Sequence, residues 1–136
     1  MKKPAAVATD KTVENGDADY EFTCQHGPAE CYGNKLHACA IDVLQNITAA
    51  IRYNSCLMDY SQAGNGSDDV AANVAIKQCA KGAKGPELLK FYGEESTKSG
   101  FTSVPYVLIN GAPGRVDHFK EDVCKAFSKP PPPCKQ

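Results

Sequence analysis

Hydrophobic and polar positions follow two different periods in the first half of the chain. Residues 20–23, Tyr-Glu-Phe-Thr, alternate between apolar and polar side chains, which predicts a short strand. Between residues 35 and 60 the apolar positions recur every three to four residues, which predicts a long amphipathic helix. Asn34 suits the N-cap of this helix because its side chain can accept hydrogen bonds from the first free backbone N–H groups.

Two more helices are expected in the middle of the chain. Ser67 or Asp68 can cap a helix over residues 69–80, which carries apolar side chains along one side. Glycines then interrupt the helical pattern. Pro86 fits the first turn of a third helix that extends to about residue 99, because the first turn does not need the N–H group that proline lacks.

The apolar pattern changes again towards the C-terminus. Residues 104–109, Val-Pro-Tyr-Val-Leu-Ile, form an apolar run rich in β-branched side chains, and Asn110-Gly111 follows as a hairpin signal. Residues 115–119 are expected to form the returning strand, and residues 120–128 a last helix.

These elements predict a single α/β domain over residues 1–136, a length that suits one hydrophobic core. Residues 1–18 are expected to be irregular. Residues 34–100 form a helical insertion between the strands, and residues 104–128 form the hairpin with the last helix.

Charge and hydropathy exclude two kinds of partner. The 15 basic and 16 acidic residues are well mixed and give a net charge of −1, so neither nucleic acid nor an anionic membrane surface is an expected partner. No apolar run approaches the ~20 residues that a membrane-spanning helix needs.

Seven cysteines and two glycosylation sequons favour the secretory route. The sequons place acceptor asparagines at Asn46 and Asn65, the second in a polar loop where a glycan fits easily. The stretch after Met1-Lys2-Lys3 is too short for the apolar core of a signal peptide. We therefore expect the printed start to be that of a truncated or processed chain.

The cysteine spacing does not predict a metal site or a cofactor. Structural zinc sites use close Cys or His pairs, whereas Cys24, Cys31 and Cys39 are separated by six and seven residues. Dithiol redox sites use Cys-x-x-Cys at the start of a helix, and that motif does not occur in the printed sequence.

The cysteines are therefore interpreted as forming structural disulfides, although spacing alone does not give their connectivity. A bridge that closes a loop of about 15 residues adds on the order of 3 kcal/mol in the chain-entropy model. We expect one cysteine to be left over, with Cys31 as the first choice. The pairs considered are Cys24–Cys39, Cys56–Cys79 and Cys124–Cys134.

His26 has two interpretations. As a general acid or base it would need a nucleophile at a fixed neighbouring position, and Gln25-His26-Gly27 provides none. A turn histidine that is hydrogen-bonded to backbone is therefore preferred, with Gly27 at positive φ before the next proline. No catalytic residue is assigned.

The pattern Cys24-Gln25-His26-Gly27-x-x-Glu30-Cys31-x-x-Asn34-x-x-x-x-Cys39 resembles, without a mismatch, the signature of the gamma-interferon-inducible lysosomal thiol reductase (GILT) family. Downstream, Val104-Pro105-Tyr106-Val107 with Asn110-Gly111 is similar to the family's strand and hairpin. The resemblance extends from about residue 20 to residue 134.

This resemblance implies a thioredoxin-like fold with a helical insertion, in a glycosylated, secreted or lysosomal protein that reduces protein disulfides. Pro105 would be a cis-proline facing the redox site, so we expect a cis Val104–Pro105 bond. Val104, Pro105 and Tyr106 would form an edge that binds the backbone of a protein partner or substrate.

The sequence departs from the family at one point. Family reductases carry Cys-x-x-Cys upstream of the signature, on a strand–helix unit, whereas the 23 residues before Cys24 contain no cysteine. We therefore expect the N-terminal strand–helix with the redox pair to be missing from this chain.

Three functions remain open. The chain is a secreted binding or regulatory module without the dithiol, or a fragment of an active reductase, or a monothiol protein that forms mixed disulfides through its odd cysteine. A monomer or a disulfide-linked dimer is expected.

Overall fold

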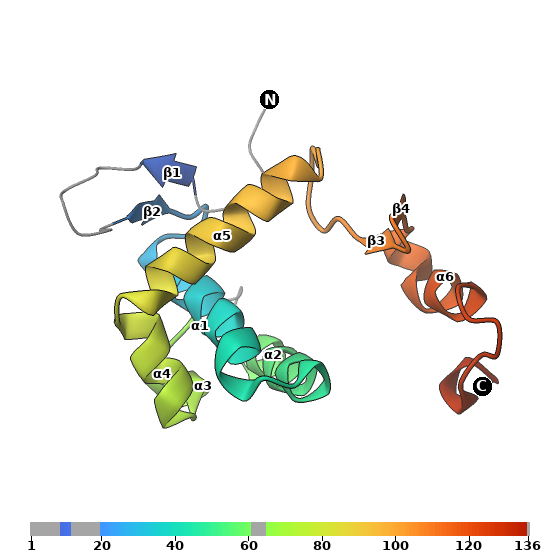
Figure 1. The fold of residues 1–136 in the computed structure, drawn as a ribbon, viewed down its shortest axis with the longest axis horizontal. Helices are drawn as coiled ribbons and strands as arrows, with labels where there is room; N and C mark the ends of the chain where they lie inside the picture. The colour runs from blue at the N-terminus through green and yellow to red at the C-terminus, as the bar shows by residue number, and fades with distance from the viewer. Residues whose placement is uncertain (1–8, 12–19, 61–64, 136) are drawn as a thin grey trace. The chain divides into compact units, whose positions relative to one another are not determined.

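The computed structural model of the protein describes residues 9–11, 20–60 and 65–135 (Figure 1). The chain forms two compact units, residues 1–102 and residues 103–136, and each is described by itself. The single domain predicted from the sequence stays a prediction. Most of the predicted irregular terminus lies outside the described residues, but residues 9–11 form a strand.

In its described residues, the first unit is a two-stranded antiparallel sheet followed by five helices. Asp10 pairs with Phe22 at the centre of the sheet. The elements are β1 Thr9–Lys11, β2 Glu21–Thr23, α1 Pro28–Leu44, α2 Ile47–Tyr60, α3 Asp68–Ala71, α4 Val74–Lys81 and α5 Lys84–Lys98.

Helix α1 begins earlier than the sequence pattern predicts. Gly27 has a φ of 93° and directs the chain into Pro28, which occupies the first turn. Asn34, the predicted N-cap, therefore lies inside α1. The positive φ predicted for Gly27 is confirmed.

The long helix predicted over residues 35–60 is two helices. Gln45 adopts a left-handed conformation at φ 49°, which ends α1. Asn46 then caps α2, since its side-chain oxygen accepts the backbone N–H of Ala49 at 2.9 Å. Local capping chemistry thus interrupts an apolar pattern that continues across the break.

The helix predicted over residues 69–80 is divided in the same way. Ser67 caps α3 by accepting the N–H of Val70 at 3.2 Å, as the sequence suggested. Ala72 is left-handed at φ 55°, and Asn73 caps α4 by accepting the N–H of Ile76 at 3.0 Å.

The core of the first unit surrounds α1. This helix packs against α2, α4 and α5, and Figure 1 shows it between them. Leu36, Cys39 and Ile76 are fully buried, and Leu57 and several alanines complete the buried cluster around them. Gly85 lies at the start of α5, where an added Cβ would come within 2.6 Å of the carbonyl oxygen of Ala80. This close approach lets α5 follow α4 directly.

The second unit contains a hairpin, a short helix and two 3₁₀ turns, and none of its described residues is fully buried. Asn110 and Gly111 have φ values of 51° and 82°, as a tight hairpin turn requires. The elements are β3 Leu108–Ile109, β4 Ala112–Pro113, the 3₁₀ turn Val116–His118, α6 Phe119–Lys125 and the 3₁₀ turn Pro132–Lys135.

The returning strand predicted over residues 115–119 is wrong. A two-residue turn brings the chain back at once, so Ala112 pairs with Ile109, and residues 116–118 already form a 3₁₀ turn. The first strand is also shorter than the predicted residues 104–109. The Val104–Pro105 bond is cis, which confirms that prediction.

The fold is a mixture of helices and strands, which agrees with the predicted α/β class at that level. Among the described residues the strands form two separate antiparallel pairs, so the thioredoxin-like arrangement stays a prediction. In the same part of the chain, no helix is long and apolar enough to span a membrane.

Candidate functional site

The signature segment, residues 24–39, is held by a disulfide between Cys24 and Cys31. Both half-cystines are buried, at 7% and 6% exposure. The predicted Cys24–Cys39 bridge and the free Cys31 are therefore wrong. Because α1 already begins at Pro28, Cys31 lies in its first turn beside Cys24, and Cys39 lies two turns further along the helix.

The same turn is closed by Glu30. Its Oε2 atom accepts the backbone N–H of His26 at 2.6 Å and lies 2.7 Å from Nδ1 of the His26 ring. Glu30 is buried while the His26 ring is half-exposed. This contact resembles one half of a capping box, except that the N–H group belongs to His26, one residue before the N-cap Gly27, and the glycine has no side chain to complete the box. His26 thus lies in a turn, as expected, but its ring contacts the Glu30 carboxylate and not the backbone that was predicted from the sequence.

Asn34 completes this cluster, since its Nδ2 atom lies 3.8 Å from the sulfur of Cys24. Gly33 is in contact with the loop before α3, where the N–H of Gly66 donates to the carbonyl of Ala29 at 2.7 Å. Among the fixed residues of the signature segment, Cys24, Glu30 and Cys31 are buried and hold one structural turn, while Gln25 and His26 are exposed on it. The geometry assigns them a positioning role at the start of α1.

The second disulfide joins Cys39 of α1 to Cys79 of α4. The predicted Cys56–Cys79 pair is wrong, and Cys56 is the free, exposed cysteine. The break before α2 sets the orientation of that helix, so Ala50 and Leu57 face the core. Cys56 precedes Leu57 by one position, about 100° around the helix, and faces solvent.

The third disulfide joins Cys124 to Cys134 in the second unit, the pair that the sequence also suggested. Both half-cystines line an open groove of about 700 Å³. We call it the C-terminal groove; its walls include His118, Phe119, Cys124, Lys125, Phe127 and Cys134.

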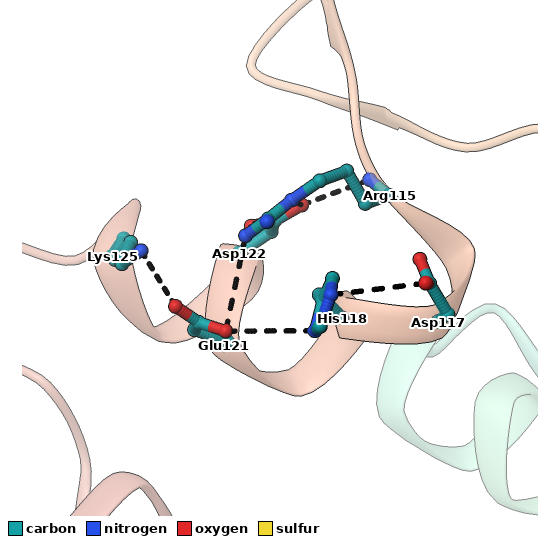
Figure 2. A network of polar contacts seen from close by, with 6 residues as sticks. All are labelled: Arg115, Asp117, His118, Glu121, Asp122 and Lys125. Atoms are coloured by element: carbon teal, nitrogen blue, oxygen red, sulfur yellow. Dashed lines mark hydrogen bonds and ion pairs between the residues drawn. The ribbon is translucent and has the colours of Figure 1, made fainter.

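A network of charged side chains surrounds the start of α6 (Figure 2). Arg115 donates from its side chain to Asp122 at 2.6 Å and from its backbone N–H at 2.8 Å. The Arg115 guanidinium holds the pKa of Asp122 at about 2. Lys125 binds Glu121 at 2.7 Å and lowers its pKa in the same way.

Sequence reasoning missed this network and the groove beside it. His118 lies 3.7 Å from a carboxylate oxygen of Asp117 and of Glu121. Figure 2 shows the histidine ring between the two carboxylates. The one available signal was the four-residue spacing between Glu121 and Lys125 on a predicted helix. The other partners come together only because the expected returning strand is a 3₁₀ turn.

The predicted partner edge lies in the second unit, directly before β3. Val104 and Tyr106 are 38% and 39% exposed, and Pro105 is exposed between them. The signature segment belongs to the first unit. Apolar side chains at this edge are therefore available to a partner, whereas those of the signature turn are mostly buried.

The two sequons differ in accessibility. Asn46 and Thr48 are exposed at the junction of α1 and α2. Asn65 is half-buried, and its side-chain oxygen has no hydrogen-bond partner among the described residues. Exposure favours Asn46 as the acceptor, and glycosylation at either site stays a prediction. In the described part of the chain, no three His, Cys, Asp or Glu side chains are grouped as a metal site.

Comparison with known proteins gives a consistent set of relatives. The family model of the gamma interferon inducible lysosomal thiol reductase (GILT) matches residues 3–83. A gamma-interferon-inducible lysosomal thiol reductase-like protein of Anopheles gambiae is 35% identical over 86% of this chain and 59% of its own length.

Two further relatives are also similar to this chain over about half of their own length. GILT-like protein 1 of Drosophila melanogaster is 38% identical over 68% of this chain and 46% of its own length. The gamma-interferon-inducible lysosomal thiol reductase of Mus musculus is 27% identical over 73% of this chain and 43% of its own length. The chain thus spans about half the length of the curated relatives it matches.

The family model covers more than half of the chain, and the Anopheles protein is more than 30% identical over most of it. With the unbroken signature segment around the Cys24–Cys31 disulfide, these matches show that the chain belongs to the gamma interferon inducible lysosomal thiol reductase (GILT) family.

Proposed function

We propose that this chain is a binding or regulatory member of the GILT family, secreted or lysosomal, that does not itself carry out dithiol reduction. The observation that carries this proposal is the state of its seven cysteines. Three disulfides use six of them and leave only Cys56 free. Dithiol reduction requires one thiolate to attack and a second thiol to resolve the mixed disulfide. Cys56 has no second free thiol in the chain.

The partner is a protein segment that binds in extended form at the edge formed by Val104, Pro105 and Tyr106. The exposure of Val104 and Tyr106 supports this proposal, because large apolar side chains next to a strand suit an added strand of peptide. Binding to an array of short extended peptides tests it. Tyr106→Ser should lose that binding, while Tyr60→Ser, which changes an exposed tyrosine of α2, should retain it. Equal binding by both variants would place the partner site elsewhere.

The absence of dithiol chemistry is tested by turnover of a disulfide-bonded protein substrate between pH 4.5 and pH 7. We expect no more than the background that one free thiol gives, and Cys56→Ser should remove that background. Robust turnover that disappears only when two cysteines are alkylated would contradict the proposal.

The alternative is that the chain is part of an active disulfide reductase whose Cys-x-x-Cys segment it does not contain. The observation that favours it is that the chain spans about half the length of its relatives, two of which are named as thiol reductases or reductase-like. The gene sequence upstream of the Met1 codon separates the two proposals. An upstream Cys-x-x-Cys supports the reductase, and a stop codon or unrelated sequence there supports the binding module.

A further inference from the structure

The three disulfides differ in how far a reagent in solvent can reach them. Cys24, Cys31 and Cys39 are at most 7% exposed. Cys79 is half-buried and packs against the main core cluster, and its partner Cys39 is fully buried. Cys124 and Cys134 are both half-buried and line the open C-terminal groove. Thiol–disulfide exchange requires a thiolate to approach a sulfur atom. The third bridge is the one in which both half-cystines are half-buried and line an open groove, so we expect it to be the most accessible of the three.

The surroundings of Cys124 and Cys134 also favour exchange. No described residue of the second unit is fully buried, and the bridge spans only ten residues, four of them consecutive prolines. Opening it therefore exposes no packed core. Lys125 follows Cys124 directly and lines the same groove together with Glu121, to which it is paired at 2.7 Å, and Asp117.

The groove has apolar walls next to the disulfide. Phe119 and Phe127 line it and are each 50% exposed, and Pro130 lies beside them. Two half-exposed phenylalanine rings can cover an apolar side chain of a bound peptide. This shape suits a cysteine that has an aromatic or aliphatic neighbour.

We propose that the C-terminal groove is a thiol–disulfide exchange site, in which Cys124–Cys134 accepts electrons from a cysteine-containing peptide with an apolar neighbouring residue. The peptide thiolate attacks Sγ of Cys134, the Cys124–Cys134 bond breaks, and Cys124 leaves as a thiolate. A second peptide thiolate attacks the mixed disulfide at its peptide sulfur. Cys134 leaves as a thiolate, and the two peptides remain joined by a disulfide. Each chain consumes two peptide thiols, so the reaction is stoichiometric and is distinct from the turnover tested above.

The first test is the order of opening under increasing concentrations of a small dithiol. Free thiols are then alkylated and mapped by mass spectrometry on the intact protein. Cys124 and Cys134 should be labelled before any of the four cysteines of the first unit. Labelling of Cys24, Cys31, Cys39 or Cys79 at the same or a lower dithiol concentration would overturn the proposal.

The second test compares two blocked dipeptides, Phe-Cys and Ser-Cys, as reductants of Cys124–Cys134. The Phe-Cys peptide should react about three- to tenfold faster with the wild-type chain, which is the size of effect that aromatic contacts give. Phe127→Ser should bring the two rates within about twofold of each other.

Phe91→Ser is the matched control, because Phe91 is 51% exposed and lies on α5 outside the groove. This variant should leave the preference for the Phe-Cys peptide unchanged. Equal rates with the wild-type chain would overturn the peptide preference, and they are measurable whether or not the variants fold.

Discussion

At the residue scale, the signature segment acts as a structural device. Its buried glutamate binds the backbone of His26, and its first two cysteines bond to each other. Gly27 supplies the positive φ that brings these groups together. The fixed spacing thus reflects the geometry of one turn and the start of one helix.

We expect Glu30→Ala to lower the free energy of unfolding by about 1.5–3 kcal/mol, the range for a hydrogen bond to a charged group. The variant leaves the N–H of His26 without its acceptor and creates space at the start of α1. Urea denaturation measures the change. Glu95→Ala, which removes a surface pair with Lys98, serves as the control and should stay within about 0.5 kcal/mol of wild type. A change of that small size for Glu30→Ala would show that the turn does not depend on this carboxylate.

The Arg115–Asp122 pair gives a prediction about pH. The pKa of Asp122 in the folded state is about 2, below its ordinary value of 3.8. The pair therefore contributes stability above pH 3.8, and this stability is lost as the pH falls towards 2. Carboxyl-carbon NMR should give a midpoint of about 2 for Asp122. Arg115→Gln should raise that midpoint towards 3.8 without reaching it, because the backbone N–H of residue 115 and the charge of Lys125 still lower the pKa of Asp122. A wild-type midpoint near the ordinary value would show that the pair does not form in solution.

Residue-level chemistry was only partly readable from the sequence. The number of paired cysteines and the positive φ of Gly27 follow from composition and turn chemistry. The partners of Cys24 and Cys79 do not follow from the sequence. The partner of Cys24 depends on where α1 begins, and the partner of Cys79 depends on how α2 is oriented. Both depend on capping residues whose alternatives differ little in energy.

At the scale of elements, helices were easier to predict than their ends. Apolar periodicity located the helical regions, but it continued across the breaks after α1 and α3. Asn46 and Asn73 set those breaks by capping the helix that follows. The hairpin turn was found from Asn110-Gly111, and β3 lies inside the strand predicted over residues 104–109. The short extent of β3 and the position of β4 were not found, since a two-residue ladder leaves almost no periodic pattern.

The Cys39–Cys79 bridge holds α1 and α4 together across 40 positions of sequence. In the chain-entropy model a loop of that length adds about 4 kcal/mol of stability. We expect the double variant Cys39→Ser with Cys79→Ser to lower the free energy of unfolding by a large part of that amount, measured by urea denaturation followed by far-UV circular dichroism. Cys124→Ser with Cys134→Ser is the matched control and should leave the transition of the helical unit unchanged. If both double variants behave alike, the helices do not depend on the core bridge.

At the scale of the whole molecule, family membership was readable from sixteen residues, whereas the arrangement of strands was not. The signature segment encodes a local turn, so it can be recognised without knowledge of the fold. A thioredoxin-like sheet depends on pairing between distant segments, which local patterns do not specify. The family match over residues 3–83 therefore supports the identity of the chain more strongly than its topology.

The proposed function depends on a chain in which six cysteines are paired and only Cys56 is free. Alkylation of the native, non-reduced protein followed by peptide mapping in a mass spectrometer tests this most directly. The account predicts one label per chain, on Cys56, or a dimer linked through Cys56, together with the three intramolecular disulfides intact. Three or more labels per chain, or a label on any of the six paired cysteines, would contradict it.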